Sequence, residues 1–379
     1  MAEWVFWLSV GAVVYAYLGY PAVLSLLVHL RARQTDAPPG SDDDLPAVAM
    51  IVPVHDEQRI IEGKLANTRE LLYPAGKLDI VFVSDGSTDG TVPMIRSQLD
   101  ARTTIIELTA RGGKAAALNA ALDAITHPVV VFSDASIILA PDAIKAIVRP
   151  FAIPEIGCVS GEDRIAGLGG EGLYGRYELY LRRKESQLQS IVGASGSFYA
   201  QRRHLCAPFE AGLAPDFLSA LRTVEGGYRA VTQPAAVGEM AALDNVSDEF
   251  RRKVRTILRG LTTLRRYAHL LNPFRSGVFA FELWSHKVAR WLVPFFLVAA
   301  LLASGWLARD SAIYRLIFVV QVLVYALGLL APRLAGGPVA ASIVTRIAVY
   351  FAVVNVATLW AWVKYFGGTR QELWQPSRR

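Results

Sequence analysis

Acidic side chains follow short apolar runs in this sequence, at points where a buried strand would end. Residues 80–91 read IVFVSDGSTDGT, and the β-branched and aromatic run at 80–83 is typical of a strand buried on both faces of a parallel sheet. A glycine-rich loop follows and is expected to present Asp85 and Asp89 to solvent. Because open α/β sheets bind ligands at the carboxyl ends of their strands, both carboxylates are candidate ligand-binding groups. The alternative for Asp89 is that it caps the following helix.

The same arrangement recurs after two other apolar runs. Asp56 and Glu57 follow one run and Asp134 follows another, and the carboxyl ends of neighbouring parallel strands meet at one edge of a sheet. Between these acids, RGGK at 111–114 opens a predicted helix, where backbone N–H groups and the helix dipole favour an anion. Its spacing fits neither a P-loop nor a GxGxxG loop. Carboxylates beside an anion site suit a diphosphate held with a divalent cation, which suggests a nucleotide-sugar donor.

Short apolar runs alternate with helical patterns through the middle of the chain. This alternation predicts an α/β domain with a doubly wound parallel sheet, whose loops gather at one edge. The predicted strands lie at 48–54, 80–83, 103–108, 129–133 and 158–160. The predicted helices lie at 57–72, 92–99, 114–125 and 141–151.

The composition indicates membrane segments as well, because 53% hydrophobic residues in a chain of 379 is too apolar for a wholly soluble protein. Residues 5–28 carry no charged side chain and are long enough to cross a bilayer, with a bend expected at Pro21. This segment lacks a basic start and a small-residue cleavage site, so it is predicted to be a retained anchor. Uncharged runs at 291–308, 316–332 and 347–363 are borderline in length, and one of them could be a buried or re-entrant helix.

Basic residues beside these segments bear on orientation. Arg31 and Arg33 follow the first segment, so the positive-inside rule places Met1 outside and the polar middle of the chain in the cytosol of a plasma (inner) membrane protein. Three further complete spans would leave the C-terminus outside. Basic residues near that end argue instead for the inside, namely Lys364, Arg370, Arg378 and Arg379. The sequence leaves this conflict open.

The cysteines and the charge narrow the possible functions. Cys158 and Cys206 lie in the predicted cytosolic part, where no disulfide is expected, and are predicted to be buried small hydrophobes. The net charge of +6 fits a protein beside anionic lipid or one that handles phosphates. No charged residue lies in the three late apolar runs, which argues against an ion-coupled transporter.

Seven segments resemble the ordered motif set of family 2 glycosyltransferases. The resemblance covers residues 48–290 and is specific because the order and spacing of all seven agree. It implies a GT-A fold and an inverting sugar transfer from a nucleoside-diphosphate sugar, with no nucleic-acid partner. The segments are VPVHDE (52–57), VSDGSTDGT (83–91), RGGKAAALN (111–119), FSDAS (132–136), GASGSFYAQRR (193–203), PDFLSALRTVEGGYRAV (215–231) and EFRRKVRTILRG (249–260).

The resemblance implies where the donor would bind. Pro53, Glu57 and Asp85 would lie at the base and ribose of the nucleotide, with Lys114 near the same pocket. Asp134 corresponds to the first acid of the family's DxD motif, which holds Mg2+ or Mn2+ against the donor diphosphate.

The second acid of the DxD motif is absent, because Ser136 stands in its place. Mg2+ binds one or two carboxylates and completes its shell with water and phosphate oxygens, so Asp134 alone can suffice with weaker affinity. The alternative is that Asp134 only caps a turn.

Asp216 corresponds to the family's general base. An inverting transfer needs one carboxylate near the acceptor hydroxyl, opposite the leaving diphosphate, to take its proton. Asp216 also precedes a helical pattern, so N-capping is the competing role. Pro215 stands where the family usually has another acid, which leaves no second carboxylate directly before the base.

A small-residue segment and a basic helix complete the expected site. Seven basic residues between 251 and 266 alternate with apolar ones at helical spacing, which is typical of a helix on a membrane surface. The resemblance implies that Arg252 and Arg255 neutralise the diphosphate leaving group. The segment that would line the cleft for donor sugar and acceptor, although it also suits close packing, contains Gly193, Ser195, Gly196 and Ser197.

Other residues near these motifs are expected to be structural. Tyr174, Tyr177 and Glu178 lie on a predicted helix that leads to the small-residue segment, and His286 has no partner at metal-ligand spacing. Thr256 stands where chain-extending members carry a tryptophan that stacks on the acceptor sugar, which weakens the case for a processive synthase.

These patterns predict six regions along the chain. They are an N-terminal transmembrane anchor (1–33), a linker (34–46), a cytosolic GT-A domain (47–245), amphipathic interface helices (246–290), C-terminal transmembrane helices (291–366) and a basic tail (367–379). The linker prediction rests on the Pro-, Gly- and Asp-rich stretch DAPPGSDDDL at 36–45.

The resemblance implies a metal-dependent hexosyltransferase with its catalytic domain in the cytosol. It would move one sugar, with a UDP-hexose or UDP-N-acetylhexosamine as expected donor, to a polyprenyl-linked acceptor in surface-glycan synthesis, and membrane lipids are expected partners. One alternative is a processive polysaccharide synthase that extrudes its polymer. Another, favoured by the missing DxD acid and by Pro215, is a non-catalytic membrane scaffold or nucleotide-binding subunit.

Overall fold

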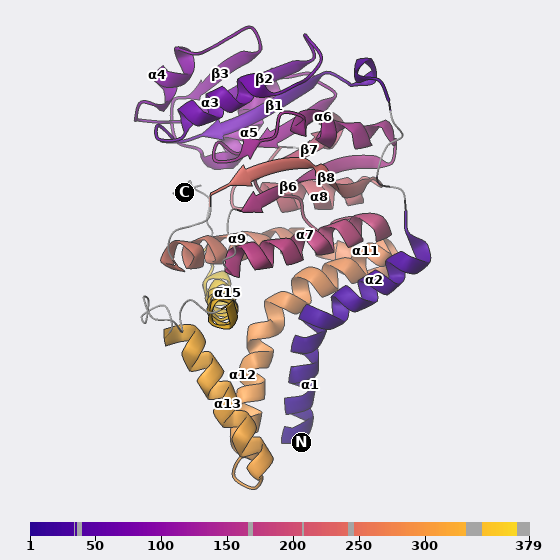
Figure 1. Cartoon of the computed structure of the whole chain (residues 1–379), viewed down its shortest axis with the longest axis vertical. Coiled ribbons are helices and arrows are strands. Elements are labelled where there is room, and N and C mark those ends of the chain that lie inside the picture. The colour runs from indigo at the N-terminus through magenta and orange to yellow at the C-terminus, as the bar shows by residue number, and fades with distance from the viewer. Residues whose placement is uncertain are drawn as a thin grey trace.

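The computed structural model describes residues 1–33, 35, 40–165, 170–206, 208–241, 246–330 and 343–369. The chain forms layers along its longest axis (Figure 1). A sheet flanked by helices forms one end and long helices form the other, with α7 (Gly170–Leu188), α9 (Val246–Arg266) and α11 (Val278–Leu283) between them. Parts of the predicted linker (36–39), third apolar run (331–332) and basic tail (370–379, with Arg370, Arg378 and Arg379) lie outside the described residues.

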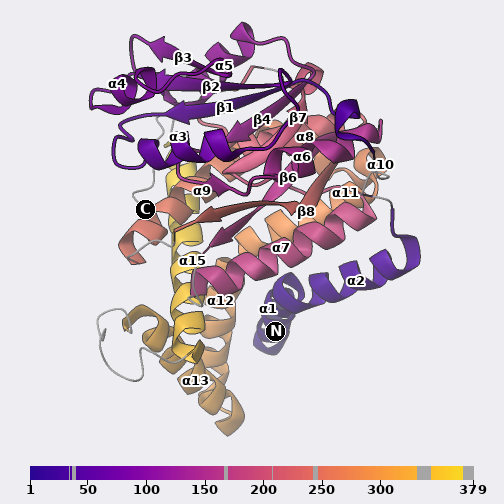
Figure 2. The same cartoon turned by 45° about the horizontal axis from the view of Figure 1, so that its top comes forward.

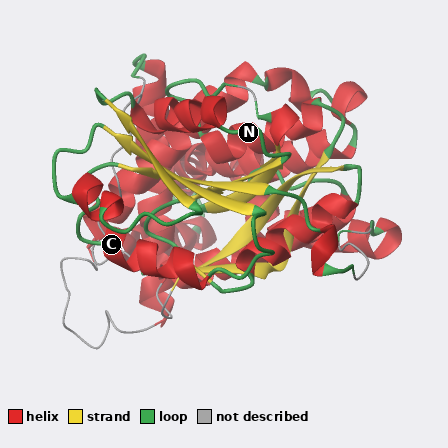
Figure 3. Ribbon diagram, turned by 90° about the horizontal axis from the view of Figure 1, so that it is seen from above, coloured by secondary structure: helices red, strands yellow, loops and turns green. Residues whose placement is uncertain are grey.

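The first layer contains one sheet with the strand order β3-β2-β1-β4-β7-β6-β8-β5. Helices cover both faces of this sheet (Figure 3). The strands are β1 (Val48–Val54), β2 (Leu78–Asp85), β3 (Thr103–Leu108), β4 (Val129–Ser133), β5 (Ile138–Leu139), β6 (Ile156–Ile165), β7 (Phe198–Arg202) and β8 (Arg229–Met240).

The α/β fold class is confirmed, but the sheet is parallel only in part. Strands β3, β2, β1 and β4 are parallel, as predicted. Strand β7 runs antiparallel to both β4 and β6, and β5 runs antiparallel to β8. Ser133 at the end of β4 pairs with Phe198 at the start of β7, so the chain enters β7 at the edge where it leaves β4. The five strands that the sequence predicted, β1 to β4 and β6, therefore run in one direction, whereas β5 and β7, which it did not predict, make the sheet mixed.

Most predicted elements of the first half are present. The strands predicted at 48–54, 103–108 and 129–133 coincide with β1, β3 and β4, whereas β2 and β6 extend beyond their predicted cores. Strands β5, β7 and β8 were not predicted. The four predicted helices are found as α3 (Ile61–Glu70), α4 (Thr91–Arg96), α5 (Gly113–Ala124) and α6 (Ala143–Val148). Helices α3, α4 and α6 are shorter than predicted, and α5 has the predicted length but begins one residue earlier.

Strand β4 shows how one apolar run supports both faces of the sheet. Val130 and Phe132 pack into one hydrophobic core with α5, and Val129 and Val131 pack into the other with α3 and α6. Such burial on both sides is what a continuous apolar strand predicts. The cysteines are free and buried, as expected.

The basic helix α9 does not lie with its apolar side on lipid. Val254, Ile257 and Leu258 pack against Ala357 and Ala361 of α15 (Ile343–Phe366). This partner helix covers the apolar face of α9, whose position at a membrane surface stays a prediction. The basic face of α9 points toward the sheet domain.

Helix α7 joins the sheet domain to the N-terminal helices. It lies beside α2 (Tyr20–Arg31) (Figure 2), and Leu181 and Leu188 pack with Tyr20 and Leu24. The bend expected in the first apolar segment occurs at the π-helical turn Tyr15–Gly19, directly before α2, where α1 (Ala2–Val14) changes direction (Figure 1).

Among the described residues, three helices are long and apolar enough to cross a membrane: Ala2–Arg31, Val278–Leu307 and Thr345–Phe366. The predicted third run corresponds to α13 (Ala312–Leu330), whose apolar part, Ala312–Gly328, is shorter. Helices α1, α12 (Ala289–Leu307) and α13 pack together through Phe6, Ala300 and Ala303.

Candidate active site

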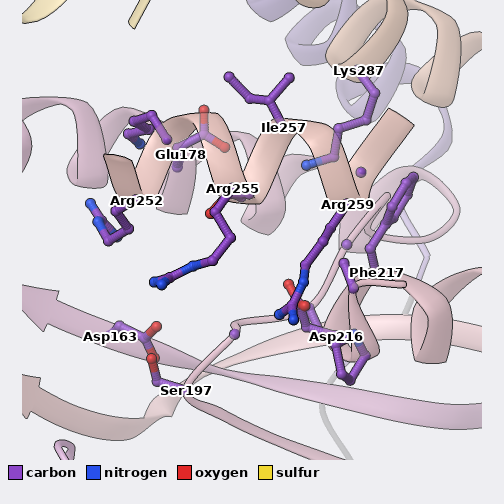
Figure 4. Close-up of a pocket in the computed structure, with 18 of the residues that line it drawn as sticks. Asp163, Glu178, Ser197, Asp216, Phe217, Arg252, Arg255, Ile257, Arg259 and Lys287 are labelled. Atoms are coloured by element: carbon purple, nitrogen blue, oxygen red, sulfur yellow. The ribbon is translucent and has the colours of Figure 1, made fainter. Parts of the chain in front are cut away.

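A cavity of about 400 Å3 lies where the carboxyl edge of the sheet meets α9 and the long helices. Its wall combines groups from the sheet loops with groups from the helices (Figure 4). Asp134, the predicted cation ligand, and Asp216, the predicted base, both line this one cavity. Had they opened into separate spaces, no single transfer site could contain both.

Asp134 is held at the end of β4 by bonds from two other segments. Its backbone N–H donates to Ser197 O at 2.9 Å. Lys114, in the first turn of α5, donates from Nζ to Asp134 Oδ1 at 2.5 Å and to Gly196 O at 3.3 Å. Ser136 also lines the cavity. The ion pair therefore joins the end of β4, the start of α5 and the small-residue segment at the cavity wall.

Glu57 lies on the cavity wall in an unusually acidic setting. Burial, reinforced by Asp134, Asp89 and Asp56, raises its pKa to about 7. The preceding residue Asp56 has φ 50°, a left-handed conformation that is rare outside glycine, and its Oδ1 accepts from Thr88 N–H at 2.7 Å. Glu57 therefore ionises near neutral pH at a strained turn, which is typical of functional sites.

Asp85 was predicted to face solvent, but its side chain is fully buried. Its Oδ1 accepts from Gly112 N–H at 2.7 Å and its Oδ2 from Gly113 N–H at 2.9 Å. The anion at the start of α5 is thus Asp85 itself, and the prediction of a free anion site at 111–114 is wrong. Gly113 adopts φ 82°, which favours glycine. Contact of Asp85 with the base or ribose stays a prediction.

Pro53 and Asp89 have clear local roles. Pro53 is buried within β1, where it pairs in register with Val83, and its contact with the nucleotide also stays a prediction. Asp89 Oδ1 accepts from the N–H and hydroxyl of Thr91 at 3.0 and 2.6 Å, where α4 begins. Asp89 therefore supports the start of α4 from the position before the N-cap residue, which is Gly90.

The small-residue segment before β7 contributes three of its four predicted residues to the cavity: Gly193, Gly196 and Ser197. Ser195 is fully buried instead, and its hydroxyl donates to Asp163 Oδ1 at 2.5 Å while accepting from Ser197 N–H at 3.1 Å. Ser195 thus supports the segment from within.

Asp216 stands in the first turn of α8 (Pro215–Glu225) without capping it. The N-cap residue is Ala214, and α8 has no side-chain cap, so the competing role for Asp216 is wrong. Ala214 N–H donates to Thr263 Oγ1 at 3.0 Å, which fastens the start of α8 to α9. A Cβ on Gly196 would lie 3.8 Å from Asp216 Oδ2. The carboxylate therefore faces the small-residue segment, where an acceptor was expected.

Three arginines of α9 line the cavity at helical spacing, Arg252, Arg255 and Arg259 (Figure 4). Burial and neighbouring Arg252 lower the pKa of Arg255, whereas Asp134 opposes the shift. Burial and Arg255 lower the pKa of Arg259, whereas Asp216 opposes it. The helix therefore concentrates positive charge between the two aspartates, where a diphosphate would be stabilised. Arg259 was not predicted.

A divalent cation would find few protein ligands here. Within the described residues, no group of three or more His, Cys, Asp or Glu side chains is placed to hold a metal. Asp134 and nearby Glu57 offer carboxylates, but Lys114 pairs with the first. Since Mg2+ binds one or two carboxylates together with substrate phosphates, these residues fit a cation that shares the donor diphosphate, once Lys114 has moved away from Asp134.

The helix that carries Glu178 is part of a buried ionic network. Glu178 accepts from Arg290 Nη1 at 2.5 Å and lies 3.1 Å from His286 Nε2. Burial alone would raise the pKa of Glu178, but Arg290 and His286 hold it well below its usual range. The rings of Tyr174 and Tyr177 lie against Arg290, at 5.2 and 5.4 Å. This arrangement agrees with the structural role expected for these residues.

Sequence patterns missed Lys64, which is fully buried in α3. Its Nζ donates to Ser133 Oγ and Ile137 O, both at 2.8 Å, on either side of Asp134. Burial lowers the pKa of Lys64 to about 7, and Asp134 opposes the shift. The available signal was a lysine at a core position of an amphipathic helix.

Three other cavity residues, Asp163, Arg182 and Lys287, were also missed. The signal for Asp163 was an acid after the strand predicted at 158–160. Arg182 and Lys287 lie outside every motif, so only the packing of α7 and the segment before α12 brings them together.

Part of the chain matches a known protein family, and the structure is similar to a solved one. Residues 49–206 match the model of Glycosyl transferase family 2. The structure is similar to the mannosyltransferase PcManGT from Pyrobaculum calidifontis in complex with GDP-Man and Mn2+, with a TM-score of 0.77 and 25% identity, covering 98% of this chain and 100% of that one.

Two curated relatives match part of the chain. The poly-beta-1,6-N-acetyl-D-glucosamine synthase of Staphylococcus aureus is 29% identical over 36% of this chain and 33% of its own length. The beta-monoglucosyldiacylglycerol synthase of Synechocystis sp. is 28% identical over 43% of this chain and 34% of its own length. The match thus spans about a third of each relative. Residues 49–206 of this chain thus match Glycosyl transferase family 2, and the structure has a GT-A domain joined to helices long and apolar enough to cross a membrane.

Proposed function

We propose that the protein is an inverting hexosyltransferase that moves one sugar from a nucleoside-diphosphate sugar to an acceptor held at the membrane. The observation that carries this proposal is that Asp134, Arg255 and Asp216 line one cavity from three different elements. The similar mannosyltransferase structure contains GDP-Man and Mn2+, which supports this donor class and adds GDP-mannose to the UDP-sugars as a donor to test.

In this proposal Asp216 is the general base. It takes the proton of the acceptor hydroxyl as that oxygen bonds to C1 of the sugar. The bond between C1 and the diphosphate oxygen breaks on the opposite face, and the diphosphate leaves with the electron pair. Arg255 and Arg252 offset the charge that develops on the leaving group.

Asp134, with Glu57 beside it, is the residue that would hold Mg2+ or Mn2+. A bound divalent cation supplies further neutralisation of the diphosphate charge. Lys114 holds Asp134 until the donor arrives and then turns its ammonium group to a donor phosphate. Pro53 and Asp85 would support the nucleotide pocket through the loops that follow β1 and β2.

The acceptor would reach Asp216 from the side of the long helices. Tyr17, Trp291 and Val354 belong to these helices and line the same cavity. An acceptor linked to a polyprenyl chain would place its lipid beside them and its sugar near Gly193 and Gly196. In this proposal the protein is integral to the plasma (inner) membrane, with the interface helices (246–290) at the membrane and the GT-A domain (47–245) in the cytosol, as Arg31 and Arg33 after the first apolar segment suggest.

Sugar transfer by the purified full chain with Mn2+ tests the proposal. A panel of UDP-sugars and GDP-mannose is offered with prenyl-linked glycan acceptors to the wild type, Asp216→Asn and a control, Asp142→Asn, whose side chain is exposed and caps no helix. Asp216→Asn should lower kcat by about 10²–10⁴-fold with donor affinity unchanged, and the product should have the inverted anomeric configuration. Equal inertness of the wild type and Asp216→Asn across the panel would contradict a catalytic role.

The same assay distinguishes the proposed single transfer from its two alternatives, a processive synthase and a non-catalytic subunit. A ladder of long products from one donor would identify a processive synthase, an outcome worth testing because the Staphylococcus aureus relative is a poly-beta-1,6-N-acetyl-D-glucosamine synthase. Thr256, which lines the cavity, favours a single addition instead. Nucleotide binding without any transfer would identify a non-catalytic subunit.

A further inference from the structure

Two cations on the helix side of the cavity form no close ion pair among the described residues, although Glu178 and Asp216 attract the charge of one of them, Lys287. Lys287, in the π-helical turn Trp284–Val288, and Arg182, in α7, are both partly buried and line the cavity. Among the described residues, neither side chain forms an ion pair or a hydrogen bond. The Lys287 ammonium group lies over the ring of Phe217, 5.5 Å from the ring centroid. Partly buried cations without a partner carry a desolvation cost that a bound anion offsets.

Neighbouring Arg290 shows how a cation in this region is otherwise satisfied. It donates to Glu178 Oε1 at 2.5 Å and to Tyr174 OH at 2.7 Å. The ring of Tyr17 also lies against its guanidinium group, at 5.7 Å. Arg290 thus has an ion pair and a hydrogen bond, whereas Lys287 and Arg182 nearby have neither among the described residues. This difference sets the two cations apart from their neighbour.

Lys287 lies beside the proposed base. Phe217, on which its ammonium group rests, directly follows Asp216 in α8. A Cβ on Gly193 would lie 3.6 Å from Lys287 Nζ. Figure 4 shows the side chains of Lys287 and Arg259 extending into the space near Phe217. An anion bound by Lys287 would therefore lie on the acceptor side of the cavity, next to the residue that receives the acceptor proton.

The wall beyond these cations is formed by the long helices. Tyr17, Trp291 and Val354 line it, and the Tyr17 ring lies 5.6 Å from the ring of Phe351 in α15. The cavity thus combines a cationic wall with apolar helices of membrane-spanning length. A molecule with an anionic head and a hydrocarbon chain matches both parts.

We propose that Lys287 and Arg182 bind the phosphate that joins the acceptor to its lipid carrier, so that the acceptor class is a prenyl-phosphate-linked or prenyl-diphosphate-linked sugar. The inference rests on the proposed transfer to a membrane-held acceptor and specifies its chemistry. A neutral glycolipid would leave both cations unpaired, whereas a phosphate provides charge-assisted hydrogen bonds to each.

Binding of a labelled lipid phosphate tests the site without any turnover. Fluorescent farnesyl phosphate and equally labelled farnesol are titrated onto the full chain in phosphatidylcholine nanodiscs. The phosphate should bind at least about tenfold more tightly than the alcohol. Lys287→Met and Arg182→Met should each reduce phosphate affinity about tenfold, since each removes one charged hydrogen-bond donor. Equal affinities for the phosphate and the alcohol would overturn the inference.

Arg176→Met is the matched control. Arg176 lies on the same helix as Arg182 but is exposed and lines a different cavity, so this variant should bind farnesyl phosphate like the wild type. Thermal melting shows whether each variant is folded, and donor affinity should be equal in all of them. Loss of phosphate binding in Arg176→Met as large as in Arg182→Met would contradict a site at Lys287 and Arg182.

Competitors distinguish the sources of phosphate. If phosphatidylglycerol in the nanodisc displaces farnesyl phosphate completely, the site binds bilayer headgroups and the acceptor assignment is overturned. If inorganic phosphate competes at the same concentration as farnesyl phosphate, the lipid part of the inference is overturned. Absence of sugar transfer in a protein that still prefers farnesyl phosphate would instead contradict the proposed function and leave the lipid-phosphate site standing.

Discussion

Lys114 Nζ lies 2.5 Å from Asp134 Oδ1, so the carboxylate predicted to hold a divalent cation is already paired with an ammonium group. Both side chains are partly buried, and attraction between opposite charges is stronger there than in water. A cation must therefore compete with Lys114 for Asp134. A donor diphosphate offers Lys114 another anion, so we expect the cation and the donor to bind cooperatively.

Replacement of Lys114 by methionine should uncouple these two events. Lys114→Met removes the competing ammonium group, so Mn2+ affinity without donor should rise about tenfold, while donor affinity should fall by a similar factor because a phosphate ligand is lost. Isothermal titration of Mn2+ and of the donor nucleotide, each with and without the other, measures both changes. Weaker Mn2+ binding in Lys114→Met would show that the lysine does not compete.

Glu57 should make stability and cation binding depend on pH near neutrality. Its folded-state pKa of about 7 exceeds its ordinary value of 4.5, so its contribution to stability is complete below pH 4.5 and is lost as pH rises through 7. The metal-free protein should therefore melt at a lower temperature at pH 8 than at pH 5. Mn2+ affinity should rise by up to about tenfold per pH unit until pH 7, because ionised Glu57 attracts the cation.

Glu57→Gln supplies the comparison for this pH dependence. Glutamine has a similar shape but no proton to lose, so the variant should lack this part of the slope in thermal melts recorded from pH 5 to 8. Identical slopes in both proteins would exclude Glu57 as the titrating group.

Lys64 should stabilise the loop that carries Asp134. Lys64→Met leaves Ile137 O and Ser133 Oγ without their donor, which should lower the free energy of unfolding by about 1–3 kcal/mol and weaken Mn2+ binding. The control variant Lys145→Met, which breaks a partly exposed pair with Asp42, should cost about 0–1 kcal/mol. Thermal melts compare the two, and an equal effect of both changes would argue against a special role for Lys64.

Asp85 should be a structural acid rather than a ligand-binding one. Asp85→Asn replaces a carboxylate that accepts from two backbone N–H groups at the start of α5, so the melting temperature should fall by an amount equivalent to about 1–3 kcal/mol. Asp79→Asn, at an exposed pair with His127, is the control and should change it little. Loss of nucleotide affinity at full stability would instead support the predicted contact with the base or ribose.

The fold was predictable where the local pattern determined the structure. Apolar runs followed by acids located β1, β2 and β4, because a strand buried on both faces needs such a run whatever its neighbours are. Strand β7 was missed, because FYAQR has polar residues that are satisfied only by tertiary contacts. Gln201, for example, donates to Ser219 O at 3.1 Å across the domain.

The site residues that lie in the sequence motifs could be predicted, whereas the residues that hold them in position could not. Asp134, Asp216 and Arg255 share one cavity, as expected from their order in the sequence. The role of Asp85 could not be read from the sequence, since a carboxylate beside a loop looks the same whether it binds a ligand or backbone N–H groups. Lys287 could not be found either, because its position depends on how the segment before α12 packs against α8.

Helix α9 presents its arginines to the cavity and packs its apolar side against the alanines of α15. Ala357 and Ala361 are fully buried against α9, so we expect a tilt of α15 in a bilayer to move the guanidinium groups with it. Membrane thickness changes helix tilt. The acyl-chain length of the surrounding lipid is therefore expected to change the rate of sugar transfer.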